Sequence, residues 1–202
     1  MKKALTIGEL LITMAIIGII ATLVLPGLLK DYHKKLYVAK LKKSIEIIET
    51  AINQACVDNN VSYFGQTSYA STAGSGSNQQ AFLNKYFKRV GNITAKPFAA
   101  EYGTLSTGET ASIGLATEHG WAKLASGEAI SFYCAGAIFC VFRVDVNSTD
   151  GPNIGGRDMF MFMVDRATNK IYEEAPSTNC GTKNTGEGCF TKLVEDNWEM
   201  NY

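Results

Sequence analysis

Twenty consecutive residues without a charge, from Leu10 to Leu29, constrain this chain more than any other feature of its sequence. A helix of twenty residues is about 30 Å long, which matches the hydrocarbon thickness of a bilayer. A secretory signal peptide has a shorter apolar region of about 7–15 residues, followed by small residues at a cleavage site. Here the apolar run is longer and passes through Pro26 and Gly27 to Lys30. We therefore expect a retained transmembrane helix.

The overall charge is neutral, with 19 basic and 19 acidic residues, and this balance argues against a chain that coats nucleic acid. Hydrophobic residues make up 46% of the chain, which excludes disorder throughout. The neutral sum hides a basic segment, because residues 30–43 contain six Lys and a single Asp. Binding of anionic lipid or nucleic acid is one interpretation of this segment. A solvated or interface-lining helix face is the simpler interpretation, and we prefer it.

The N-terminal residues Lys2 to Ile12, KKALTIGELLI, resemble the prepilin signal of type IV pilins and type II secretion pseudopilins. The resemblance implies a leader of residues 1–4, which prepilin peptidase removes between Ala4 and Leu5 before methylating the new amine. Counted from Leu5, Glu9 is the fifth residue and Pro26 the twenty-second, where this family carries a Glu and commonly a Pro. Ala4 is a departure, because the family usually has Gly before the cut.

The resemblance implies a structural subunit that leaves the bacterial inner membrane to join a pilus or pseudopilus filament. Residues 5–29 would be the transmembrane and assembly helix, with Glu9 pairing with the Leu5 amine of a neighbouring pilin. The implied partners are other pilins, the peptidase and methylase, and the membrane-bound assembly platform. Pro26 would kink or loosen the helix, because it lacks an N–H and crowds the carbonyl of Thr22.

Membrane topology can be argued in two directions. Six Lys follow the apolar run and two precede it, so the positive-inside rule would leave the C-terminal part in the cytoplasm. All five Cys lie at or beyond Cys56, which suggests an oxidising compartment. Together with the leader resemblance, the cysteines lead us to expect a single-pass protein with its C-terminus outside.

Beyond the apolar run the pattern is that of an α+β protein. Leu41, Ile45, Ile48 and Ile52 recur at helical spacing, so residues 30–58 should form an amphipathic stem that continues the first helix. Residues 59–202 should form a globular head, with an exposed, mobile loop over 65–79 and a short helix over 81–88. Strands are predicted over 129–134, 137–146, 158–164 and 170–172. Short turns between them indicate an antiparallel sheet that packs on the long helix, as the pilin resemblance also implies.

The cysteines suggest two disulfides. Cys180 and Cys189 flank a polar loop that has little apolar content to hold it, and the stretch resembles the C-terminal disulfide-bounded loop of many pilins. Cys134 and Cys140 flank the predicted hairpin turn and form a second candidate pair. Cys56 would then stay unpaired. No C-x-x-C or paired His pattern supports a zinc site instead.

The stretch from Asp145 to Asp158, DVNSTDGPNIGGRD, is rich in the oxygen ligands that Ca²⁺ requires. Asp145, Asn147, Asp150 and Asp158 are the candidate ligands, and some pseudopilins hold Ca²⁺ in a loop of this region. The stretch departs from an EF-hand loop, because Gly156 stands where the twelfth-position Glu would be. A hydrogen-bonded turn of Asp, Asn and Gly between two strands is the alternative.

No sequence motif of an enzyme is present: G-x-S-x-G, G-x-G-x-x-G and Walker A patterns are all missing. We therefore expect a structural subunit and no enzyme. The alternatives are a membrane-anchored binding domain that never polymerises and an anchored extracellular enzyme, which would need catalytic groups that the sequence does not reveal.

Overall fold

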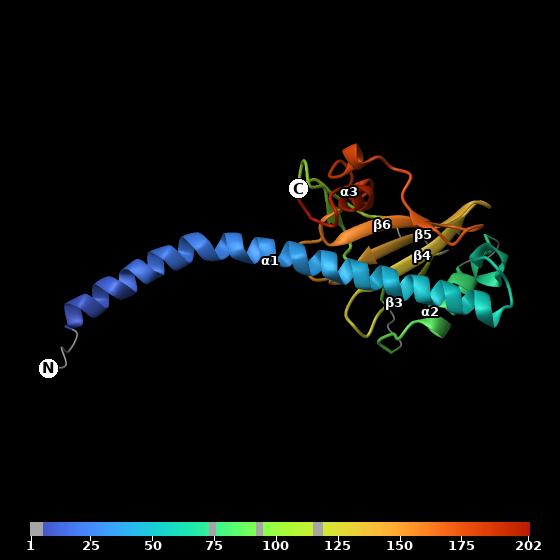
Figure 1. Cartoon of the computed structure of the whole chain (residues 1–202), viewed down its shortest axis with the longest axis horizontal. Coiled ribbons are helices and arrows are strands. Elements are labelled where there is room, and N and C mark those ends of the chain that lie inside the picture. The colour runs from blue at the N-terminus through green and yellow to red at the C-terminus, as the bar shows by residue number, and fades with distance from the viewer. Residues whose placement is uncertain (1–5, 73–75, 92–94, 115–118) are drawn as a thin grey trace. The chain divides into compact units, whose positions relative to one another are not determined.

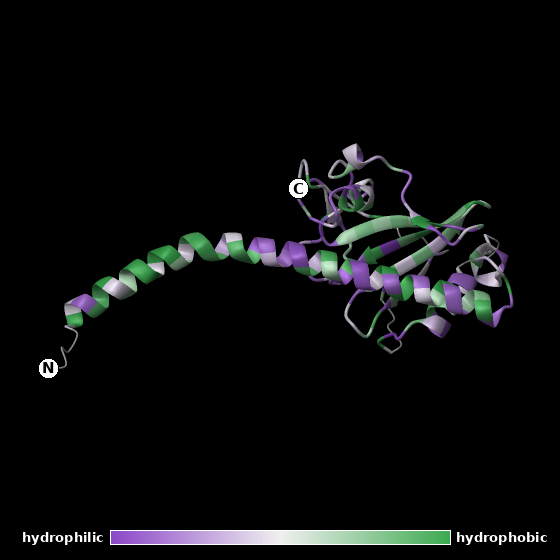
Figure 2. Cartoon of the chain, in the orientation of Figure 1, coloured by the Kyte–Doolittle hydropathy of each residue, from purple (hydrophilic) through white to green (hydrophobic). Residues whose placement is uncertain are grey.

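The computed structural model describes residues 6–72, 76–91, 95–114 and 119–202. The chain divides into two compact units, Met1–Leu36 and Tyr37–Tyr202. Helix α1, Ile7–Asp58, begins in the first unit and ends in the second (Figure 1). Figure 2 shows that its N-terminal part is predominantly hydrophobic, whereas polar and apolar residues alternate along the rest.

The long helix predicted across the apolar run and the stem is confirmed, and it ends at the expected place. Asn60 adopts a left-handed conformation with φ 53°, and the N–H of Val61 donates to the carbonyl of Cys56 at 3.0 Å. The N–H of Asn60 donates to the carbonyl of Val57. This pair of bonds is a Schellman motif, which satisfies carbonyls that the last helical turn would otherwise leave free.

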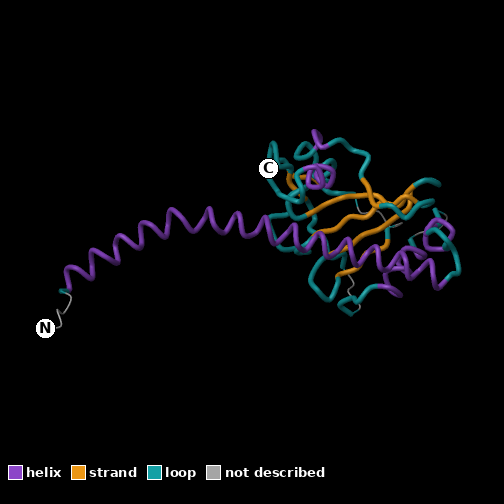
Figure 3. Tube along the Cα trace, viewed as in Figure 1, coloured by secondary structure: helices purple, strands orange, loops and turns teal. Residues whose placement is uncertain are grey.

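Five antiparallel strands form one sheet in the second unit, in the sequential order β3-β4-β5-β6-β7. Figure 3 shows strand segments in orange and helices in purple. The sheet confirms the predicted meander and adds β3, which the sequence reasoning missed. The strands are β3 Gly120–Lys123, β4 Ala129–Ala135, β5 Phe139–Asp145, β6 Met159–Asp165 and β7 Ile171–Tyr172.

The core of the second unit lies between one face of this sheet and the C-terminal part of α1. Leu41, Ile48 and Ile52, three members of the predicted apolar stripe, are at most 1% exposed. On the sheet, Phe132, Phe142 and Phe162 lie side by side on β4, β5 and β6, and none of them is exposed. The predicted packing of the stem on the sheet is therefore confirmed by this shared cluster of buried side chains.

The segment predicted as an exposed loop over 65–79 is partly buried, so that prediction is wrong in part. The 3-10 helices Phe64–Gln66 and Ser68–Ala70 bury Phe64 and Ala70. Helix α2, Ser77–Tyr86, starts four residues earlier than the predicted helix. Buried Gln79 donates to the carbonyl of Ser71 at 2.7 Å, and so joins this segment to α2. Residues 73–75 of the predicted loop lie outside the described residues.

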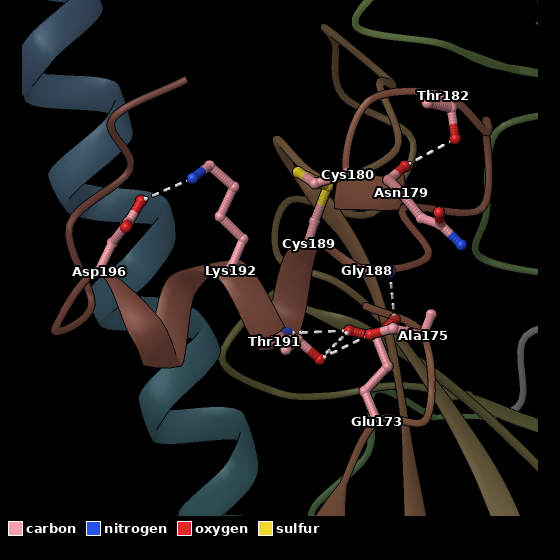
Figure 4. The surroundings of a disulfide bond; sticks show 10 residues. All are labelled: Glu173, Ala175, Asn179, Cys180, Thr182, Gly188, Cys189, Thr191, Lys192 and Asp196. Carbon is pink, nitrogen blue, oxygen red and sulfur yellow. Dashed lines mark hydrogen bonds and ion pairs between the residues drawn. A yellow bond between two sulfur atoms is a disulfide. The ribbon is translucent and has the colours of Figure 1, made fainter. Parts of the chain in front are cut away.

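Two small elements complete the second unit. Strands β1 Tyr102–Gly103 and β2 Thr110–Ala111 form a separate ribbon beside a second, smaller buried cluster. Helix α3, Cys189–Glu195, follows the 3-10 helix Ser177–Asn179. Figure 4 shows how Glu173 caps α3: its carboxylate accepts from the N–H of Gly188 at 2.6 Å and from that of Thr191 at 2.9 Å. A partly buried acid from a neighbouring segment thus satisfies donors at the start of a seven-residue helix.

The outer edge of β3 is occupied by a side chain of α2. The Gln80 amide accepts from the backbone N–H of Trp121 and donates to its carbonyl, both at 3.1 Å. Gly120 allows this approach, because a Cβ there would lie 2.7 Å from the carbonyl carbon of Gln79. The next residues of the edge are also paired, since the N–H of Val90 donates to the carbonyl of Lys123.

Candidate functional site

The first unit presents an apolar helix surface. The large apolar side chains from Ile7 to Leu29 are between 46% and 81% exposed. Helix α1 is long and apolar enough to cross a membrane, and none of the apolar window that meets this test is buried. In water such a surface would be unfavourable, because each exposed aliphatic side chain forgoes about 1.5–3 kcal/mol of burial. The surface of this segment is thus suited to a lipid or protein environment.

Glu9 lies at the start of this helix and caps it. Its carboxylate accepts from the backbone N–H and the hydroxyl of Thr6, both at 2.9 Å. In return, the Thr6 hydroxyl accepts from the N–H of Glu9 at 3.3 Å. This reciprocal arrangement is a capping box, which satisfies two backbone donors at the helix start. The sequence reasoning did not identify it, although the Thr-x-x-Glu spacing is its signal.

Of the other residues proposed for processing and assembly, Pro26 lies within the described part of the chain. Ala4 and Leu5, the predicted cleavage and methylation residues, lie outside the described residues. Pro26 lies within α1, which continues through it as a helix. The Thr22 hydroxyl, one turn before Pro26, donates to the carbonyl of Ile19 at 2.9 Å.

The candidate calcium loop is folded by hydrogen bonds to its own carboxylates. Asp158 accepts from the N–H groups of Asn153 and Ile154, both at 2.7 Å. Asp145 accepts from the N–H of Asn147 at 3.0 Å and from the hydroxyl of Tyr102. The Asp145–Asn147 bond is that of an Asx turn, and Asp158 closes the loop by accepting from backbone N–H groups four and five residues before it.

The electrostatics of the loop follow from burial. Both Asp145 and Asp158 are fully buried. Burial raises the pKa of Asp145 to about 7, and the nearby charge of Asp158 adds to the rise. Burial also raises the pKa of Asp158, against the lowering effect of its two backbone donors.

The four candidate ligands do not form a cation cage. Asp150 is exposed, and Asn147 donates its amide to the carbonyl of Gly151 at 2.8 Å. Two buried acceptors of this loop, Oδ1 of Asn147 and Oδ1 of Asn153, have no hydrogen bond. Within residues 6–72, 76–91, 95–114 and 119–202, no group of three or more His, Cys, Asp or Glu could hold a metal ion. The arrangement favours the hydrogen-bonded turn over the calcium site.

With the loop folded in this way, we expect millimolar calcium to change the melting temperature of chelator-treated protein by less than about 1 °C. The reason is that a cation would have to displace the backbone donors from Asp158 before it could bind. Differential scanning fluorimetry with magnesium as the control ion measures this. A calcium-specific rise of several degrees would establish the site that the sequence pattern suggested.

The structure contains both candidate disulfides. Cys134 and Cys140 are directly opposed partners on β4 and β5, close to the hairpin turn. Cys180 and Cys189 join the segment after the 3-10 helix to the first residue of α3 (Figure 4). Cys56 is the free cysteine, and it is buried at the end of α1.

The disulfide loop packs against the candidate calcium loop backbone to backbone. A Cβ on Gly155 would lie 2.6 Å from the nitrogen of Gly186 and would also clash with the carbonyl of Asn184. The adjacent glycines Gly155 and Gly156 therefore lie where two loops cross closely. Sequence reasoning had explained this stretch by a calcium site or a turn.

Removing the Cys180–Cys189 bridge should destabilise the second unit by about 2.5–3 kcal/mol, because the bridge closes a loop of about ten residues in the unfolded chain. The double variant Cys180→Ala/Cys189→Ala, denatured with urea in detergent, tests this. Cys56→Ala is the matched control, since it removes a cysteine but leaves both bridges intact. A loss below about 1 kcal/mol would mean that the loop is held by its packing on Gly155 instead.

One polar cluster was missed entirely. Arg143 interrupts the apolar strand β5, and it lies with His119, Tyr133 and Ser131 on the sheet face opposite the phenylalanines. The signal was present in the sequence as a lone Arg between Phe142 and Val144. His119 is buried, with only 9% of its surface exposed.

Comparisons with protein-family models, with curated proteins and with solved structures each found no match to this chain.

Proposed function

We propose that this chain is a structural subunit of a type IV pilus-like or type II secretion pseudopilus filament, assembled through its N-terminal helix. Prepilin peptidase removes residues 1–4, and the subunit waits in the inner membrane with its C-terminus outside. The assembly platform then transfers it into a periplasmic or cell-surface filament with other pilins. The proposal includes no catalytic activity and no nucleic-acid partner.

The observation that carries the proposal is the uniformly exposed apolar surface of α1 between Ile7 and Leu29, with one carboxylate at its start. A helix that is apolar on all sides can be surrounded by lipid or by other such helices. Both environments are needed by a subunit that is first a membrane protein and then the core of a polymer. The antiparallel head and its C-terminal disulfide loop also agree with the pilin resemblance.

Glu9 is the proposed registration point between subunits. In the isolated chain its carboxylate binds Thr6. In a filament, the carboxylate would face the positively charged Leu5 amine of a neighbour inside an apolar bundle. Such a pair is costly to break, because removing one partner leaves an uncompensated buried charge, at about 3–5 kcal/mol.

The second candidate is a membrane-anchored binding domain that does not polymerise. The Thr6–Glu9 capping box favours it, because Glu9 then has a structural role inside its own chain and needs no neighbour. The two candidates differ in processing. Mass spectrometry of the native N-terminus should find a chain that begins at N-methylated Leu5 if the filament proposal holds. An intact Met1-Lys2-Lys3 terminus would contradict it.

Two variants separate the proposed role of Glu9 in filament assembly from its role in capping the helix. Glu9→Gln keeps a side-chain acceptor for the capping box but removes the charge, whereas Thr6→Val removes the hydroxyl and keeps the charge. We expect Glu9→Gln to reduce filament yield more than about a hundredfold, from the cost of an unpaired amine. Thr6→Val should retain assembly, since a lost cap costs only about 0.5–2 kcal/mol.

Sheared filaments are quantified by immunoblot against total subunit, and the filaments are viewed by electron microscopy. Equal yields from wild type and Glu9→Gln, with normal processing, would support the monomeric anchor instead. Deleting the chain then distinguishes the two kinds of filament: loss of surface fibres and motility indicates a pilus, and loss of enzyme secretion indicates a pseudopilus.

A further inference from the structure

The sheet face turned away from α1 carries a buried cation. Arg143 lies in the middle of β5, directly opposite Ser131 on β4 and Met161 on β6. Its side chain is only 8% exposed. Burial lowers the pKa of the guanidinium from its ordinary value, but an Arg stays charged at any physiological pH. The fold thus keeps a positive charge out of water.

Two rings hold the guanidinium in place without neutralising it. Arg143 lies over the ring of Tyr133, 5.3 Å from its centroid. His119 stacks on the same ring, with centroids 4.1 Å apart and planes 8° from parallel. The Nη1 of Arg143 lies 3.3 Å from Nδ1 of His119. Since Arg can only donate, His119 accepts through Nδ1 and carries its proton on Nε2.

Two donors of this cluster have no acceptor in the part of the chain that the structure describes. The Nε of Arg143 is buried without a hydrogen-bond partner. The hydroxyl of Ser131 is likewise buried and unpartnered, and this residue is 0% exposed. No acidic side chain among the described residues forms an ion pair with Arg143. A buried guanidinium in this state pays its desolvation penalty without a compensating anion.

We propose that Arg143 and Ser131 form a binding site for a carboxylate. The Nε edge of a guanidinium matches the two oxygens of a carboxylate, and the Ser131 hydroxyl adds a third donor from the opposed strand. Tyr133 and His119 form the wall that orients the guanidinium. The carboxylate is either free in solution or carried by a second copy of the chain, and the site does not depend on filament assembly.

The chain offers a clear probe, because His119 and His33 are its two histidines. We expect acetate, added to the full chain in detergent micelles, to shift the His119 ring resonances and the Arg143 Nε–H signal in NMR spectra. The shifts should saturate on the order of millimolar acetate, as befits a ligand of four heavy atoms. His33 should not respond, and chloride at equal ionic strength is the control anion.

A protein dilution series without acetate separates the two sources. If the His119 signal moves with protein concentration and acetate has no effect, the carboxylate belongs to a second copy. If acetate moves it at constant protein concentration, the ligand is free in solution. If neither titration moves it, the proposal is wrong.

Variants make the assignment specific. Arg143→Lys keeps the charge but removes the Nε edge, and should weaken acetate binding at least about tenfold. Ser131→Ala should weaken binding several-fold while leaving the ligand-free melting temperature unchanged or raised, because it deletes an unsatisfied hydroxyl. Arg89→Lys is the matched control and should bind acetate like wild type.

A final variant tests whether the chain supplies its own anion. Glu118 directly precedes His119 in the sequence. If acetate binds only to Glu118→Gln and not to wild type, the counter-ion of Arg143 is this internal carboxylate, and the proposed ligand site is overturned.

Discussion

Replacing Phe142 with alanine is expected to lower the free energy of unfolding of the second unit by about 3–5 kcal/mol. Phe142 is fully buried at the centre of the sheet. Its ring lies 4.8 Å from that of Phe132 and 6.1 Å from that of Phe162, with planes within 14° of parallel. The truncation therefore removes the middle ring of a three-strand stack and leaves a cavity that the two strands beside it cannot easily close.

Tryptophan fluorescence during urea denaturation measures this change. Trp121 and Trp198 are the two tryptophans of the chain, and both belong to the second unit, so the signal is independent of the apolar segment. Phe142→Leu should cost less, about 1–1.5 kcal/mol. Ile138→Ala, in the exposed turn of the same hairpin, should change stability by less than about 0.5 kcal/mol. A small effect of Phe142→Ala would show that the phenylalanine stack is not the centre of the core.

Gly155→Ala should destabilise the second unit by about 3 kcal/mol although it adds a single methyl group. The added Cβ would meet backbone atoms of Asn184 and Gly186, and backbone cannot rotate away as a flexible side chain can. Relief requires the disulfide loop to move as a whole, and the Cys180–Cys189 bridge opposes that movement.

Gly103→Ala is the matched control for this substitution. Gly103 accepts a hydrogen bond from the N–H of Gly155 at 3.0 Å, but a Cβ at Gly103 would meet only ordinary contacts of 3.7 Å or more. The free energy of unfolding of the Gly103→Ala variant should therefore stay within about 0.5 kcal/mol of the wild-type value. If Gly155→Ala proves equally mild, the two loops do not cross at this point in solution.

The larger elements were predictable because their signals are local and periodic. The stripe of Leu41, Ile48 and Ile52 repeats at helical spacing, and the strands of the meander are rich in β-branched and aromatic residues. Strand ends came within about two residues, as for Met159–Asp165 against the predicted 158–164. Local sequence is sufficient where an element is long enough to show its period.

The elements that were missed depend on partners that are distant in sequence. Helix α3 is seven residues long and needs the Glu173 carboxylate, 15 residues before Gly188, to satisfy its first N–H groups. Strand β3 is four residues long and begins with a glycine, which is a poor strand former on its own. In both cases tertiary contacts outweigh weak local preferences.

The same contrast applies to the candidate site. Sequence reasoning selected Asp145, Asn147, Asp150 and Asp158 as candidate ligands, and the structure buries only the two outer ones, Asp145 and Asp158. Sequence reasoning could not predict that the carboxylate oxygens of Asp145 and Asp158 accept hydrogen bonds from within the protein. The donors are Asn147, Asn153, Ile154 and Tyr102, and their positions depend on how the loop folds back. Arg143 was overlooked because a single charged residue in an apolar strand produces no repeating sequence pattern.

The hydrogen bonds from the Gln80 side chain of α2 to the edge strand β3 matter when many copies of the chain lie close together. A bare edge strand offers a template on which another chain can add by β-augmentation, and such addition leads to aggregation. Gln80 occupies both backbone groups of Trp121, and Val90 occupies the carbonyl of Lys123, so this edge has few free positions for a foreign strand. Many copies held close together, on a membrane or in any array, would therefore be less prone to pair edge to edge through β3.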